Sequence, residues 1–96
     1  MLTSKQKAYL RKLGNSEKAI FQIGKDGISE NTIIGIGDGL KANELLKFNL
    51  LKGCSLTARE AAIEVASLTQ SEIVQIIGRT VILYKHNAEG RIKFPR

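Results

Sequence analysis

The sequence is poor in the residues that build cross-links, cofactor sites and stacking surfaces. Its 96 residues include one cysteine, one histidine and one proline, and no tryptophan. A single cysteine, Cys54, cannot form an intramolecular disulfide, which agrees with a reducing, cytoplasmic compartment. Cys54 and His86 together offer too few ligands for a zinc site of the usual kind. Aromatic residues make up 5% of the chain, so a broad platform for stacked bases is not expected.

Long apolar runs are missing as well. No stretch approaches the roughly 18 consecutive apolar residues of a membrane-spanning helix, and the start of the chain lacks the apolar core of a signal peptide. We therefore expect no membrane association. The length suits one compact domain over residues 1–96, and we find no internal repeat, linker or low-complexity tract.

The sequence also lacks the groupings of residues that catalysis requires. His86 lies beyond the end of a predicted strand, and we interpret it as a surface histidine. Cys54 is interpreted as a small structural residue of a loop rather than a reactive thiol. The segment GIGDGLK, residues 35–41, fails both the dinucleotide-binding fingerprint and the P-loop pattern. We predict no enzymatic activity, no cofactor, no metal site and no small-molecule substrate.

Positive charge is abundant and lies at both ends of the chain. The formal net charge of +6 divides into +5 over residues 1–25, −3 over residues 26–78 and +4 over residues 79–96. Basic ends around an acidic middle favour a polyanionic partner, provided that the two ends meet in space. The alternative is charge that serves solubility alone.

Periodicity and capping signals predict the order helix, strand, helix, strand, helix, strand, strand. We expect the first helix to follow an N-cap at Thr3 and to stop at Gly14, the second to open at Ser29, and the third to begin with a capping box from Thr57 to Glu60. The strands are expected at residues 18–23, 45–51, 72–77 and 80–85, with Gly78 and Arg79 turning the final hairpin. This pattern indicates an α/β fold, a four-stranded mixed sheet packed with helices.

The second predicted helix contains three glycines, Gly35, Gly37 and Gly39. Each lowers helix stability by about 1 kcal/mol relative to alanine. Either the backbone packs very closely at these positions or the helix is soft.

The segment GKDG, residues 24–27, stands between the first strand and the second helix. Its two glycines permit unusual backbone angles and close approach, and the helix start behind them leaves N–H groups with partial positive charge. Lys25 adds a mobile charge. A Gly-x-x-Gly loop that clamps the RNA backbone is typical of KH-type modules. The alternative is a simple turn.

Five segments carry a resemblance to a known family in their order and spacing: LRKLG (10–14), QIGKDGIS (22–29), NELLKF (43–48), QIIGRTVILYK (75–85) and RIKFPR (91–96). The chain resembles the CRM domain in its stand-alone bacterial form, the YhbY-like proteins. The resemblance implies an RNA-binding domain similar in fold to the C-terminal domain of the third bacterial translation initiation factor. It also implies association with precursors of the large ribosomal subunit, and it places the Gly-x-x-Gly loop on residues 24–27. An acid at Asp26, where an uncharged polar residue is more usual, is expected to weaken the grip on phosphate.

Together these observations predict a cytoplasmic, monomeric RNA-binding protein that associates with ribosomal RNA during large-subunit assembly. With few aromatic residues, recognition is expected to depend on shape and backbone. The residues predicted to contact RNA are Gly24, Lys25, Asp26, Gly27, Lys5, Arg11, Lys12, Arg79 and Lys85. The rival hypothesis is a protein-interaction module that docks on an acidic ribosomal or assembly partner.

Overall fold

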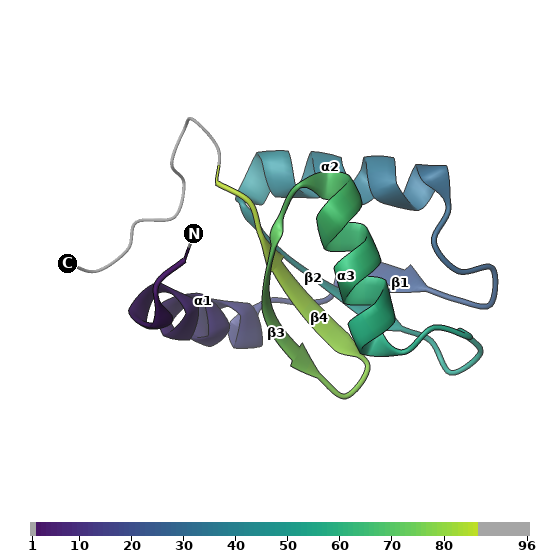
Figure 1. Cartoon of the computed structure of the whole chain (residues 1–96), viewed down its shortest axis with the longest axis horizontal. Coiled ribbons are helices and arrows are strands. Elements are labelled where there is room, and N and C mark those ends of the chain that lie inside the picture. The colour runs from purple at the N-terminus through teal and green to yellow at the C-terminus, as the bar shows by residue number, and fades with distance from the viewer. Residues whose placement is uncertain (1, 87–96) are drawn as a thin grey trace.

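The computed structural model describes residues 2–86, which form three helices and four strands in the predicted order (Figure 1). The strands build one mixed sheet in the order β1-β2-β4-β3, in which β1 and β2 are parallel and the other neighbours are antiparallel. The predicted α/β fold is therefore confirmed. The segment RIKFPR lies outside the described residues. The elements are α1 (Ser4–Ser16), β1 (Phe21–Ile23), α2 (Glu30–Asn43), β2 (Leu45–Leu50), α3 (Ala58–Thr69), β3 (Glu72–Ile77) and β4 (Thr80–Tyr84).

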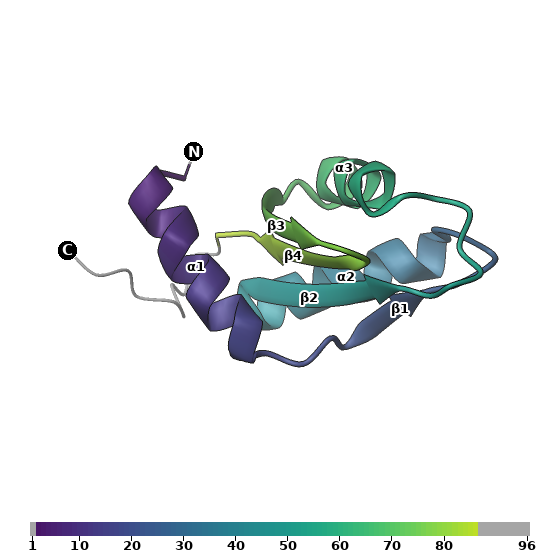
Figure 2. The same ribbon diagram turned by 90° about the horizontal axis from the view of Figure 1, so that it is seen from below.

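The helices lie on opposite faces of the sheet. Successive strand residues point to alternate faces, so β2, β3 and β4 supply apolar side chains to both. On one face, α2 and α3 bury a cluster that includes Ile36, Val65 and Phe48. On the other face, α1 buries Leu10 in a smaller cluster with Ile82. Figure 2 shows α1 at one end of the sheet, apart from α3. The larger core therefore lies under α2 and α3, and α1 covers only part of its own face.

The predicted end of the first helix at Gly14 is wrong. The helix continues to Ser16, and Gly14 is buried on the side that faces the sheet. A Cβ atom at Gly14 would lie 2.7 Å from Cδ1 and 2.9 Å from Cγ2 of Ile82. The missing side chain lets the helix backbone approach β4 closely, so this glycine serves packing rather than helix termination.

The other element boundaries differ from the prediction mainly at the first strand. Residues 18–20 are not part of β1, although the Ile20 N–H still donates to the Lys47 carbonyl oxygen at 3.1 Å. Leu51 and Lys85 fall just beyond the ends of β2 and β4. The capping predictions are confirmed: Thr3, Ser29 and Thr57 are the N-caps of the three helices, and Thr57 forms its capping box with Glu60.

Of the three glycines in α2, two allow close packing against the sheet and one only weakens the helix. A Cβ at Gly39 would lie 2.6 Å from Cδ1 of Leu46, and one at Gly35 would lie 2.8 Å from Cε1 of Phe21. These two positions let α2 pack closely on the sheet. A Cβ at Gly37 would meet nothing within 4 Å, so no packing contact offsets its cost to the helix.

Candidate nucleic-acid interface

The GKDG segment is a tight turn that requires glycine at only one of its two glycine positions. The Gly27 N–H donates to the Gly24 carbonyl oxygen at 3.0 Å, and Gly27 has φ 72°. That angle lies in the left-handed region, which residues with a Cβ rarely adopt. Gly24 has no such angle, and a Cβ there would make a 3.4 Å contact with Cδ1 of Leu51. The conformation of the turn therefore depends on Gly27.

Several backbone donors of this turn are open to a ligand. The N–H of Gly27 is used within the turn, but those of Lys25 and Asp26 have no acceptor among residues 2–86. The start of α2 follows immediately, and the first N–H groups of a helix have no partner within the helix. Ser29 satisfies one of them by accepting from the Thr32 N–H at 3.1 Å. The remaining donors and the positive end of the helix dipole favour an anion at this point.

A second loop lies against the turn and contributes a lysine that the sequence analysis missed. A Cβ at Gly53 would lie 3.8 Å from Cβ of Lys25, and exposed Lys52 is the neighbour of Gly53. The two loops are adjacent because β1 and β2 are parallel and end at the same edge of the sheet. Lys52 was overlooked because it belongs to the acidic middle of the sequence. The predicted strand–helix–strand order was the signal that could have revealed it, because such units commonly pair their strands in parallel.

Arg79 lies at the same end of the sheet. It is exposed in the β3–β4 turn, and its carbonyl oxygen accepts from the Leu50 N–H at 2.7 Å. At the other side of β2, the Leu51 N–H donates to the Ile23 carbonyl oxygen at 2.8 Å. Only β2 therefore separates Arg79 from the turn. We call this region the loop end of the sheet, comprising Gly24–Gly27, Lys52 and Arg79.

The remaining predicted residues form a second region. Lys5, Arg11 and Lys12 are exposed on α1; at roughly 100° per residue, Lys5 and Lys12 point away from the sheet-facing side of the helix. Lys85 is half-buried just beyond β4 and lines a pocket with Leu2 and Gln6. We call these four cations the helix end, comprising Lys5, Arg11, Lys12 and Lys85.

The structure thus divides the nine predicted residues into two groups rather than one. Figures 1 and 2 both show α1 and the β1–α2 turn at opposite ends of the sheet. Each group draws on both basic segments of the sequence. At the loop end, β2 alone stands between Arg79 and the turn that holds Lys25, and at the helix end Lys85 shares a pocket with Gln6 of α1. The two basic segments at the ends of the sequence therefore come together in space at two separate places.

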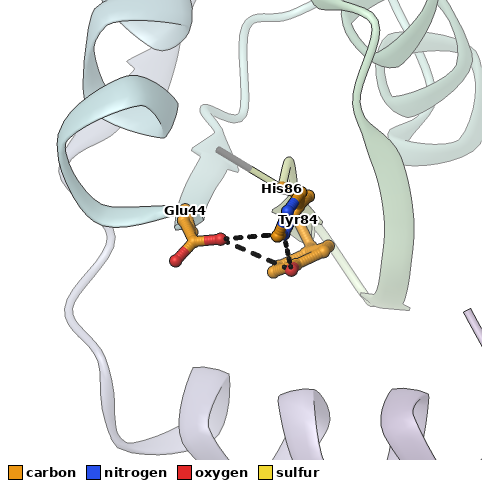
Figure 3. Close-up of polar contacts among 3 residues, drawn as sticks. All are labelled: Glu44, Tyr84 and His86. Carbon is orange, nitrogen blue, oxygen red and sulfur yellow. Dashed lines mark hydrogen bonds and ion pairs between the residues drawn. The ribbon is translucent and has the colours of Figure 1, made fainter. Parts of the chain in front are cut away.

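Sequence analysis also missed a buried carboxylate behind the helix end (Figure 3). Glu44, at the C-terminus of α2, is completely buried. Its Oε2 accepts from the Tyr84 hydroxyl at 3.4 Å and lies 3.6 Å from Nδ1 of His86. Burial, and the negative charges of Glu44 and Glu72, raise the pKa of the Tyr84 hydroxyl.

His86 is confirmed as a surface histidine, but the fold gives it an acidic neighbour. Its side chain is 76% exposed, yet it contacts a carboxylate that is distant in sequence. The Lys85 N–H also donates to the Glu44 carbonyl oxygen at 2.8 Å. These contacts attach the end of β4 to the end of α2, and they give the cluster a structural role.

Residues 2–86 show little sign of a reactive thiol, a metal site or a membrane-spanning helix. Cys54 is half-buried and packs against the larger core. No group of three or more His, Cys, Asp or Glu side chains in this range is arranged to hold a metal ion. None of its helices has the length and apolar character needed to cross a membrane.

A glycine turn that leads from a parallel strand to a helix N-terminus, with exposed cations beside it, is an arrangement that favours anionic groups in a small α/β module. The CRS1 / YhbY (CRM) domain model matches residues 2–85. The chain belongs to this family, as its resemblance predicted.

Similar proteins cover nearly the whole chain. "Probable RNA-binding protein YqeI" of Bacillus subtilis (strain 168) is 38% identical over 91 residues, which are 95% of each chain. An "RNA-binding protein" of Haemophilus influenzae is 27% identical over 95 residues, or 99% of this chain and 96% of that protein. The solution structure of the hypothetical protein SAV1595 from Staphylococcus aureus, described as a candidate RNA-binding protein, is 40% identical. It superposes with a TM-score of 0.74 and covers 99% of this chain and 100% of its own.

Proposed function

We propose that this chain is a non-enzymatic RNA-binding protein that contacts the RNA backbone at the loop end and the helix end. The observation that carries the proposal is the Gly24–Gly27 turn, where open N–H groups and a helix N-terminus lie beside Lys25 and Lys52. The RNA-binding names of the Bacillus and Haemophilus relatives and the description of the Staphylococcus structure support it.

The turn holds a phosphate through backbone donors, and the neighbouring side chains adjust the strength of that contact. Lys25, Lys52 and Arg79 neutralise phosphate charge. Asp26, within the turn, and Glu30, in the first turn of α2, oppose it. Because the acids offset part of the attraction, a single phosphate contact is weak. Useful affinity requires further contacts to Lys5, Arg11, Lys12 and Lys85.

The natural target is ribosomal RNA in precursors of the large subunit, bound by a monomer in the cytoplasm. The family resemblance supports this target. Crosslinking in cells, followed by sequencing of the bound RNA, tests it. Enrichment of large-subunit precursor RNA over mature ribosomal RNA and messenger RNA is expected. Equal recovery of all abundant RNAs would contradict it.

Binding of the purified chain to a structured RNA separates this function from docking on an acidic protein. In filter binding, a chain that neutralises about four to six phosphates gives a log–log salt slope of roughly −3 to −5. The complex should disappear on nuclease treatment. A flat salt response, with complexes from cell extract that survive nuclease, would instead indicate a protein partner.

A further inference from the structure

A strip of polar side chains remains uncovered on the sheet face that carries α1. Gln22, Asn49 and Thr80 are paired in register across β1, β2 and β4. Lys47 lies two residues before Asn49 on β2. We call these four residues, Gln22, Lys47, Asn49 and Thr80, the sheet strip. Gln22 is exposed and the other three are half-buried.

Alternation along the strands places the sheet strip on the α1 face. Phe21, Ile23 and Leu46 belong to or pack against the core under α2 and α3, so the side chains between them point the other way. Gln22, Asn49 and Thr80 lie beyond the part of this face that α1 covers, where Leu10 packs with Ile82. Lys47 is paired in register with Ile82 and lies at the border of that part.

The strip offers hydrogen-bonding groups rather than charge. The Thr80 hydroxyl donates to Oδ1 of Asn49 at 2.8 Å. The amide nitrogen of Asn49 then has two N–H donors without an acceptor among residues 2–86. Lys47 is the one charged member, and its Nζ donates to the Glu17 carbonyl oxygen at 3.3 Å. Neutral amides and hydroxyls do not neutralise phosphate, but they match the donors and acceptors of base edges.

The position of the strip joins the two basic regions. Gln22 lies two residues before Gly24, and Thr80 follows Arg79, so one side of the strip borders the loop end. The opposite side reaches α1. An apolar side chain, Ile77, lies beside it; it is 49% exposed and paired in register with Thr80. Such a side chain can cover the face of an unstacked base.

We infer that the sheet strip binds the unpaired bases of a single-stranded RNA segment that runs between the loop end and the helix end. The inference rests on the proposed function and adds selectivity for unpaired RNA. In an A-form duplex the Watson–Crick edges of the bases are occupied by pairing, and the major groove is too deep and narrow for side chains to read. Asn49 and Thr80 then lose their base contacts, while the phosphate contacts persist.

The test replaces both central groups with Asn49→Val and Thr80→Val, because β-branched side chains suit strands. Ser67→Ala, on the exposed side of α3, is the matched control for loss of a polar group elsewhere. The probes are a mixed-sequence single-stranded RNA of roughly 12 nucleotides and the duplex of the same sequence. Fluorescence anisotropy gives the affinity for each probe over a range of salt concentrations.

Loss of two hydrogen bonds predicts that the double variant binds the single strand about 5- to 20-fold more weakly. Its affinity for the duplex should change less than about twofold, and its salt slope should stay the same, because no phosphate contact is removed. Equal losses on both probes, or no loss on the single strand, would overturn the inference. The proposed function itself fails only if the unaltered chain binds neither probe in a salt-dependent way.

Two measurements keep the test valid if the double variant folds poorly. Melting curves identify that case, and Thr80→Val alone, which is nearly isosteric, then replaces the double variant. Separately, the unaltered chain is crosslinked by ultraviolet light to RNA that carries 4-thiouridine. Crosslinks are expected on the peptides that contain β2 and β4. Crosslinks confined to α1 and residues 24–27 would overturn the inference.

Discussion

The Gly27 N–H donates to the Gly24 carbonyl oxygen at 3.0 Å, and this bond closes the turn between β1 and α2. The two glycines are not equivalent, because only Gly27 has a left-handed backbone angle. A side chain at Gly27 would meet nothing within 4 Å. Glycine is therefore required there for its backbone conformation. Side-chain atoms added at this position would still hinder a ligand that approaches the turn.

Substitution by alanine should separate the two positions in stability. Gly27→Ala is expected to lower the free energy of unfolding by about 1–2 kcal/mol, the cost of left-handed backbone for a residue with a Cβ. Gly24→Ala should change it by less than about 0.5 kcal/mol, because its Cβ only contacts the exposed side chain of Leu51. Urea unfolding of both variants is the measurement. Equal effects at the two positions would contradict this description of the turn.

Packing between α1 and the sheet leads to a second prediction. Gly14→Ala should destabilise the chain by about 1–3 kcal/mol, the usual cost of overpacking. The added Cβ would lie within 3 Å of two atoms of Ile82, which is itself buried. Asn15→Ala, at the exposed neighbouring position, is the control and should be close to neutral. If Gly14→Ala proves as stable as the control, the close approach of α1 to β4 is incorrect.

The glycines of α2 should respond in opposite directions. Gly37→Ala is expected to stabilise the chain by about 0.5–1 kcal/mol, because alanine favours the helix and the site is open. Gly39→Ala gains the same helix propensity but places a Cβ 2.6 Å from Cδ1 of Leu46, which is buried. It should therefore be destabilising. Thermal melting of the two variants measures both changes. A loss of stability in Gly37→Ala would contradict the expectation that this position is open.

The Tyr84 hydroxyl should make stability depend on alkaline pH. Its pKa is raised in the folded chain, so the folded state holds this proton more tightly than the unfolded state does. The resulting stability is fully present below about pH 10 and is lost as the pH rises through the folded-state pKa. Between about pH 9 and pH 11, unaltered chain should lose more stability than Tyr84→Phe. Tyr9 is present in both and cancels in the comparison. Parallel pH profiles would contradict the shift.

The order of elements was predictable because each helix and the hairpin carry a local signal, such as the capping box of Thr57 and Glu60 or the turn at Gly78. The role of Gly14 was not predictable from sequence, since a glycine after Leu13 has the same appearance whether it ends a helix or packs against Ile82. Residues that act through long-range contacts were also missed. Glu44 reaches His86, and the loop that carries Lys52 comes to lie beside Lys25, only after the sheet has assembled.

We propose that the turn at residues 24–27 binds an RNA phosphate, and removing the charge of Asp26 is the sharpest test of that contact. Repulsion between this carboxylate and a phosphate several ångströms away is on the order of 1 kcal/mol in a largely solvated setting. Asp26→Asn should therefore tighten binding to a structured RNA several-fold at low salt, by about fivefold for that energy. Glu64→Gln, an exposed carboxylate on α3, removes the same charge elsewhere and should have a smaller effect. Titration of both variants against one RNA gives the answer: selective tightening by Asp26→Asn is predicted, and equal affinities for the two variants would contradict the claim.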